Sequence, residues 1–228
     1  MIYSILLLVI FLHSASSLSQ RSYTFDYQSE YEYRKLEGSK PSRRWFLTNS
    51  TDNTYYAFVT EAVNNEVVIR FRDRKTGLYS YIKLPREKFF DVATLKLKCK
   101  NVGYIPPLKK RDQERYDIFV KNDTIINSVS YKQYAIGNPQ IEGDLQDKYG
   151  DGVCIIENNT EFHKPLTFAV FISAEREKEF PHGIMKQMFF KNDDEQTNEK
   201  LYNLKTYTKV KKVIVIPDEC AFGPEEKK

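Results

Sequence analysis

The sequence is poor in the residues from which most catalytic and metal sites are built. It holds three histidines and three cysteines among 228 residues, and none of them forms an HExxH, CxxC or GxSxG pattern. A glycine-rich phosphate loop is also missing. Two of the histidines, His163 and His182, lie within two residues of a proline, as turn residues do. The sequence therefore identifies no motif-defined enzyme, and we expect no cofactor.

Long apolar runs are missing as well. The run Ile5–Leu12 is far shorter than the roughly 20 residues of a transmembrane helix. Mostly small residues follow after His13, which is the pattern of a secretory signal peptide. We expect residues 1–19 to be removed, with Ala15 or Ser17 as alternative cleavage positions. The mature protein is then exported to the periplasm or the extracellular space, with no transmembrane span.

Charge of one sign is not concentrated anywhere in the chain. Lysine and arginine total 35 against 31 acidic residues, a formal net charge of +4, and the basic clusters are short and scattered. A protein that binds nucleic acid normally gathers its positive charge on one face or stripe. The sequence thus predicts a mixed, solvated surface and no nucleic-acid partner.

The small number of cysteines limits the covalent cross-links. Cys99, Cys154 and Cys220 leave at least one cysteine unpaired within the chain. Export permits disulfides, and Cys99 and Cys220 each lie at the edge of a predicted strand, so we expect these two to pair. Three free thiols are the alternative. Cys154 stands in an apolar stretch and is expected to act as a small core residue.

Tyrosine and phenylalanine are abundant, with 16 and 15 residues, and many stand at alternate positions. Alternation is typical of half-buried strands, and short strands separated by polar turns suit an antiparallel sheet. We predict a mainly β fold: a single antiparallel, strongly curved sheet or half-open barrel with one or two short helices. Residues 20–216 form this single domain and residues 217–228 a charged tail. Strands are expected at residues 23–36, 44–49, 55–61, 66–72, 78–84, 94–100, 116–121, 124–137, 153–157, 166–172, 183–191 and 201–216, with turns at 64–65 and 122–123 and short helices at 85–90 and 175–180.

Several short segments combine strand and turn signatures: Phe25-Asp26-Tyr27 with Tyr31-Glu32-Tyr33, and residues 48–57, 121–127 and 155–158. In this combination the chain resembles exported proteins of flavobacteria and related Bacteroidota, and more weakly the GLPGLI-type exported proteins. The resemblance covers most of the mature chain and implies an exported β domain. By analogy of strand order, it also implies the half-open barrel of periplasmic lipoprotein carriers, whose concave face holds acyl chains.

Noncatalytic binding is the function that these features predict. We expect an exported or envelope-associated β module whose curved sheet presents aromatic side chains to a hydrophobic, lipid-like ligand or to an envelope protein. The candidate ligand-binding residues are Tyr27, Tyr31, Tyr33 and Phe58. The alternative is that these aromatic side chains fill the core.

An acidic, glycine-containing loop at residues 138–152 is the other candidate site. Its side chains Asp144, Asp147 and Asp151 offer oxygen ligands to a hard cation such as calcium, although the spacing is not that of an EF-hand. A solvated acidic turn is the alternative. The same carboxylates, aided by His163, define a rival function, a carboxylate-dependent hydrolase. A structural or adhesive surface protein is the third function class.

Overall fold

The structure is a computed structural model that describes residues 20–105, 117–137, 152–157, 183–191 and 198–220. The first half of the chain forms β1 (Gln20–Leu36), β2 (Ser42–Thr48), β3 (Tyr55–Ala62), β4 (Glu66–Asp73), β5 (Leu78–Pro85), α2 (Arg86–Asp91), β6 (Thr94–Lys96), η1 (Cys99–Asn101) and β7 (Val102–Tyr104). The second half contributes β8 (Asp117–Ile126), β9 (Val129–Gly137), β10 (Gly152–Glu157), β11 (Ile184–Lys191), β12 (Asn198–Pro217) and η3 (Asp218–Cys220). The strand predicted at 166–172 and the helix at 175–180 lie outside the described residues.

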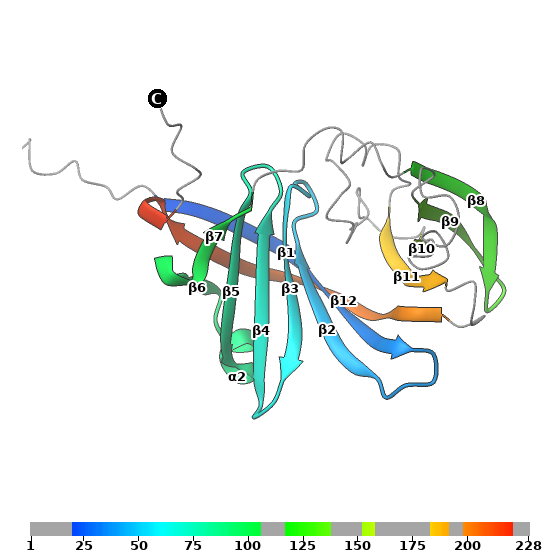
Figure 1. The fold of residues 1–228 in the computed structure, drawn as a ribbon, viewed down its shortest axis with the longest axis horizontal. Helices are drawn as coiled ribbons and strands as arrows, with labels where there is room; N and C mark the ends of the chain where they lie inside the picture. The colour runs from blue at the N-terminus through cyan, green and yellow to red at the C-terminus, as the bar shows by residue number, and fades with distance from the viewer. Residues whose placement is uncertain (1–19, 106–116, 138–151, 158–182, 192–197, 221–228) are drawn as a thin grey trace, which may run out of the picture.

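These strands belong to one 12-stranded sheet in the order β7-β5-β4-β3-β2-β1-β12-β11-β10-β9-β8, with β6 beside β12. The long strands β1 and β12 run side by side, with β2 to β5 along one part of this ladder and β8 to β11 at its far end (Figure 1). The predicted mainly β chain with one antiparallel sheet and a short helix is confirmed. The sheet is neither closed nor strongly curled, which corrects the strong curvature and the half-open barrel expected from the sequence. The long strands β1 and β12 pair in its middle, and β7 and β8 are its two separate edges.

Two hairpin turns show how local sequence sets the strand register. Asn64–Asn65 and Asn127–Ser128 all have positive φ angles, between 50° and 65°, which are typical of tight hairpin turns. Asn64–Asn65 belongs to the three-residue loop between the paired residues Ala62 and Glu66, and Asn127–Ser128 is a two-residue loop between Ile126 and Val129. The first turn is the predicted one. The second turn, at Asn127–Ser128, shows that the turn predicted at Asn122–Asp123 is wrong. Strand β8 continues through those residues and absorbs them in a bulge, seen as a register shift between Lys121 and Thr124.

The segment after α2 also differs from its prediction. The strand expected at residues 94–100 is limited to β6, which pairs in parallel with β12, and the chain then turns through η1 into β7. Leu95 and Leu97 still point into the core. The parallel pairing was not predictable from the alternation, because the same hydrophobic pattern serves either strand direction.

The two faces of the sheet are covered by separate clusters of buried hydrophobic side chains. Adjacent residues of β2 show the division, because successive side chains of a strand point to opposite faces: Trp45 belongs to the cluster on the side of α2, and Phe46 belongs to the other. The aromatic stripe of β1 contributes to both, with Phe25 in the first cluster and Tyr31 in the second. Two register shifts in the β1–β12 ladder lie between these positions. Bulges of this kind increase the strand twist, so one alternating stripe can supply two cores.

Candidate functional site

The face of strands β3, β4 and β5 that points away from α2 carries an ordered set of aromatic and arginine side chains. Residues paired across antiparallel strands share a face, so the register defines rows of neighbouring side chains. In two successive rows an arginine of β4 stands between aromatic residues of β3 and β5. The rows are Phe58–Arg70–Tyr81 and Tyr56–Arg72–Tyr79, and we call these six residues the arginine–aromatic face.

The tyrosines of β5 are open to solvent. Tyr81 is 52% exposed and Tyr79 is 36% exposed. The Tyr79 ring covers Gly103 of β7, where an added Cβ would lie 2.5 Å from a ring carbon. Arg70 is exposed and Arg72 is half-buried. A partner can therefore reach both rows of the arginine–aromatic face.

At the border of this face, Arg44 of β2 lies among three aromatic rings. Its guanidinium carbon is 3.2 Å from the ring centroid of Tyr33 and 5.3 Å from those of Phe58 and Tyr202. Its Nη1 donates a hydrogen bond to the hydroxyl of Tyr202. Cation–π contacts of this kind orient a guanidinium without neutralising its charge. Burial raises the pKa of the Tyr202 hydroxyl, and the positive charge of Arg44 is the largest opposing influence.

Arg70 approaches the same part of β3 from the other side. Its Nη1 donates to Thr60 Oγ1 at 3.4 Å, and Thr60 is the cross-strand neighbour of Arg44. The charge of Arg70 also acts to lower the pKa of the Tyr202 hydroxyl. The two guanidinium groups thus converge over β3, next to the arginine–aromatic face.

The positive charge at this place is not balanced within the described residues. The one carboxylate that the register of β2 to β5 places on the outer face is Glu66, which forms a salt bridge with Lys83. Arg44, Arg70 and Arg72 form no salt bridge in the described part of the chain. Guanidinium groups match planar or tetrahedral oxyanions through paired N–H donors. The geometry therefore suits an anionic group that also contacts aromatic rings.

The four predicted ligand-binding residues fall into two groups. Tyr31 is fully buried in the second core and donates its hydroxyl hydrogen to the Met185 carbonyl oxygen at 2.8 Å; Tyr27 is 8% exposed. Both are core side chains, which is the alternative that the sequence left open for them. Tyr33 and Phe58 are half-buried and meet at Arg44.

Sequence reasoning missed the arginines at this site. The available signal was the alternation of Ile69, Arg70, Phe71 and Arg72, which places both arginines on the face opposite the core. A strand with apolar residues at one parity and arginines at the other is common on solvated surfaces. Only the strand order shows that aromatic residues stand on both sides of each arginine.

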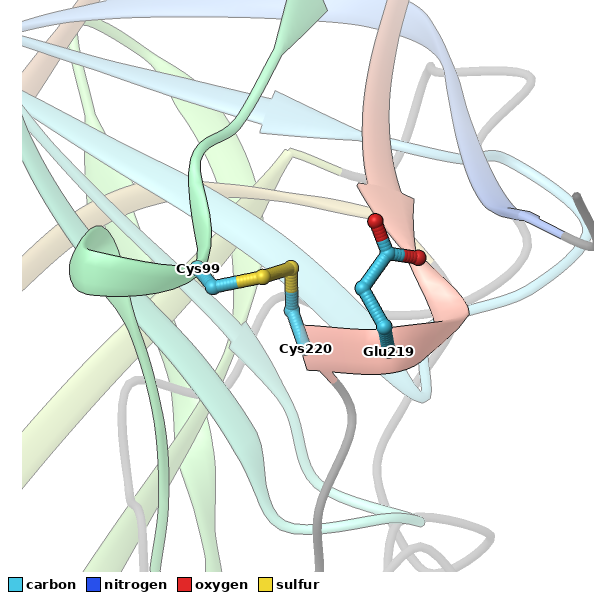
Figure 2. A group of neighbouring side chains, drawn as sticks. All are labelled: Cys99, Glu219 and Cys220. Atoms are coloured by element: carbon cyan, nitrogen blue, oxygen red, sulfur yellow. A yellow bond between two sulfur atoms is a disulfide. The ribbon is translucent and has the colours of Figure 1, made fainter.

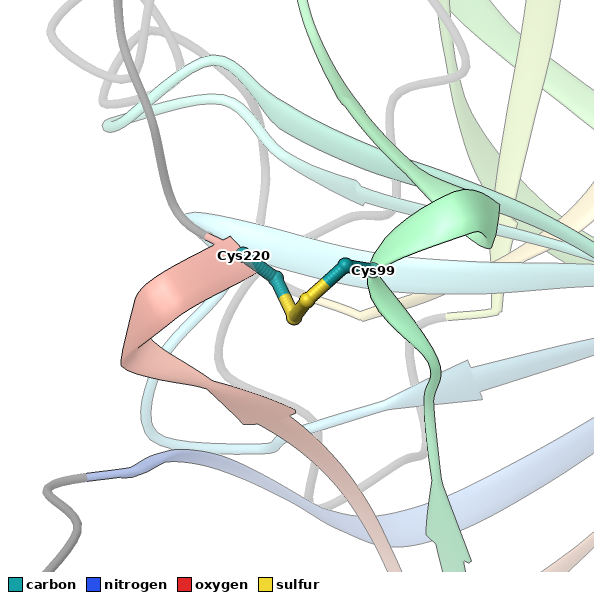
Figure 3. The surroundings of a disulfide bond; sticks show 2 residues. All are labelled: Cys99 and Cys220. Atoms are coloured by element: carbon teal, nitrogen blue, oxygen red, sulfur yellow. A yellow bond between two sulfur atoms is a disulfide. The ribbon is translucent and has the colours of Figure 1, made fainter.

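Within the described residues, one group of side chains has the spacing of metal ligands: Cys99, Glu219 and Cys220, whose ligand atoms lie within 4.8 Å of one another (Figure 2). A disulfide joins the two cysteines, with their Cα atoms 4.7 Å apart (Figure 3). The sulfurs are therefore not thiolates and cannot bind a metal ion. This is the cysteine pairing expected from the sequence, and Cys154 is free and buried as expected. The metal candidates Asp144, Asp147 and Asp151, like His163, lie outside the described residues, so the metal site and the hydrolase both stay predictions.

The disulfide also bears on the location of the protein. Disulfides are typical of proteins that fold in oxidising compartments. None of the helices in the described ranges has the length and hydrophobicity needed to cross a bilayer.

Comparison with known proteins gives only distant similarities. No model of a protein family matches the sequence. No curated protein matches it either. Among solved structures, the chain is similar at 10% identity to MucB, with a TM-score of 0.40 over 88% of this chain and 58% of that one. It is similar at the same identity to the MucA/MucB complex of Pseudomonas aeruginosa, with a TM-score of 0.41 over 81% of this chain and 51% of that one. For MucB in complex with MucA(peri), the identity is again 10% and the TM-score is 0.38, over 88% of this chain and 55% of that one. The chain spans little more than half the length of those structures. Similarities of this size establish neither a shared fold nor a shared function.

Proposed function

We propose that this chain is an exported, noncatalytic binding module that holds a partner on its arginine–aromatic face. The observation that carries the proposal is the pair of accessible aromatic–arginine–aromatic rows on β3, β4 and β5. Tyrosine and arginine are enriched at binding interfaces because each offers a large contact area together with directional hydrogen bonds.

Export is supported by two independent features. The first 19 residues have the pattern of a signal peptide, and the Cys99–Cys220 disulfide is a feature of proteins that mature in an oxidising compartment. Mass spectrometry of the mature protein tests this part of the proposal. We expect an N-terminus at Gln20 and a mass lower by the two hydrogens lost in one disulfide.

The chemistry of the face favours a protein partner over an acyl chain. A lipid-like ligand on a concave apolar face was expected to contact Tyr27 and Tyr31, but both are buried in the cores. The aromatic side chains that remain accessible alternate with guanidinium groups, and apolar acyl chains would leave those charges desolvated and unpaired. An envelope protein with polar and charged groups meets both kinds of side chain.

Site-specific photocrosslinking in the organism that makes the protein tests the binding face. A photoreactive phenylalanine derivative at Tyr81 should give a discrete cross-linked product. The matched control carries the photoreactive derivative in place of Lys88, which is exposed on α2 on the other side of the sheet. This control should give no cross-linked product. Cross-linking of equal yield from both positions, or from neither, would show that this face does not bind a partner.

A further inference from the structure

We propose that the occupant of the arginine–aromatic face is an acidic polypeptide segment in extended conformation, whose carboxylates at alternate positions pair with Arg70 and Arg72. This inference rests on the proposed function and adds the chemistry of the partner. A further carboxylate of the same segment reaches the place where Arg44 and Arg70 converge over β3. Arg44 is held there by Tyr33 and Tyr202 before any partner arrives.

Charge complementarity is the first argument. Arg44, Arg70 and Arg72 lie on one outer face with no salt-bridge partner in the described part of the chain, whereas the nearby Lys83 is already paired with Glu66. Other arginines of neighbouring strands do have carboxylate partners: Arg34 pairs with Glu32, and Arg43 with Glu30. Among the arginines of β1 to β4, the three without a salt bridge in the described part of the chain therefore lie on or beside the arginine–aromatic face, where a ligand can supply the missing carboxylates.

Spacing is the second argument. Arg70 and Arg72 are two residues apart on the same face of β4, which separates their Cα atoms by roughly 7 Å. Alternate residues of an extended peptide have the same repeat, so successive carboxylates on one side of such a peptide match successive arginines. Bidentate pairing of each guanidinium with a carboxylate fixes this register. The flanking tyrosines Tyr79 and Tyr81 then cover the aliphatic parts of the peptide side chains.

The distribution of charge argues against nucleic acid as the occupant. A protein of that class carries a basic stripe over a large surface, and here the formal net charge of the whole chain is only +4. The disulfide also indicates an oxidising compartment, in which nucleic acid is not the usual partner. Single-stranded DNA is nevertheless included as a probe in the test below.

The test uses the mature, oxidised protein and fluorescence anisotropy with labelled octapeptides. The main probe alternates Glu and Thr; the controls are a block isomer with four Glu followed by four Thr, and a neutral Gln–Thr repeat. The variant R70Q/R72Q removes both guanidinium groups of the face. The matched variant K75Q/K88Q removes the same charge from two exposed lysines elsewhere. Fluorescence of the single, buried Trp45 verifies that each variant is folded.

We expect the alternating peptide to bind at least tenfold more tightly to the parent and to K75Q/K88Q than to R70Q/R72Q. The block isomer should bind more weakly than the alternating peptide, and the neutral repeat should not bind. Equal weakening by both variants, or equal affinity for the two acidic peptides, would overturn the proposal, since either result indicates unspecific charge attraction.

Binding of single-stranded DNA or anionic phospholipid vesicles with the same dependence on Arg70 and Arg72, but no binding of the peptide, would also overturn it. Failure of every probe removes the acidic peptide as occupant. The photocrosslinking from Tyr81 decides separately whether the face binds a partner at all.

Discussion

The Cys99–Cys220 disulfide should contribute a large part of the stability of this protein. It connects residues 121 positions apart and so closes a loop that includes β7 to β12. In the chain-entropy description, closing a loop of this length stabilises the folded state by about 5 kcal/mol, and measured values are usually smaller. We therefore expect the variant C99S/C220S to lose about 3–5 kcal/mol of the free energy of unfolding. Most of this loss arises because the unfolded chain regains conformational freedom.

Urea unfolding followed by the fluorescence of Trp45 measures this loss, because the chain has one tryptophan and its side chain is 1% exposed. The oxidised parent, the reduced parent and the double variant are compared, and the last two should unfold at the same urea concentration. Thiol titration of the denatured, unreduced parent should find one free cysteine, Cys154. A double variant within about 0.5 kcal/mol of the oxidised parent, which is the range of ordinary surface substitutions, or three titratable thiols before reduction, would refute the reasoning.

Three further predictions concern stability. Burial raises the pKa of the Cys154 thiol to about 12, so between pH 9 and 12 the folded state keeps a proton that the unfolded state loses. The free energy of unfolding, measured in urea titrations, should therefore fall with rising pH. The variant C154A should show a weaker dependence on pH. Gly77 and Gly38 both have φ near +80°, but a Cβ at Gly77 would lie 2.4 Å from the Ile105 carbonyl oxygen, whereas a Cβ at Gly38 would meet nothing within 4 Å. In thermal unfolding, G77A should therefore be more destabilised than G38A. Equal melting temperatures of the two variants would contradict this. Lys212 donates three hydrogen bonds to carbonyl oxygens at the end of α2, so K212M should lose about 2–3 kcal/mol in urea unfolding, while K211M at the adjacent exposed position should change it little.

The strands of the first half of the chain were predictable because their signals are local. Alternation in β1, β3 and β5 marks a more buried and a more exposed parity. Asn64–Asn65 adopts the positive φ angles that are typical of tight hairpin loops. The β8–β9 hairpin was predicted with the wrong turn, since Asn122–Asp123 and Asn127–Ser128 carry similar turn signals. The structure selects the second pair, and the first becomes a bulge in β8.

Two of the four predicted ligand-binding residues lie at the candidate site. Tyr33 and Phe58 were named from the aromatic alternation, and both contact Arg44. Tyr31 has the same alternation but is fully buried. Periodicity identifies residues that share a face of one strand, and it does not say whether another part of the chain covers that face.

By itself, the sequence determined the class of the fold and many strand boundaries, because alternation and turn chemistry act over a few residues. It also indicated the pairing of Cys99 with Cys220. Only the tertiary structure decided that β1 and β12 meet in the middle of an open sheet, which follows from pairing between residues almost 200 positions apart. The same long-range pairing sets Arg70 and Arg72 between aromatic neighbours from β3 and β5. Relations between strands depend on register and order, and no local pattern encodes them.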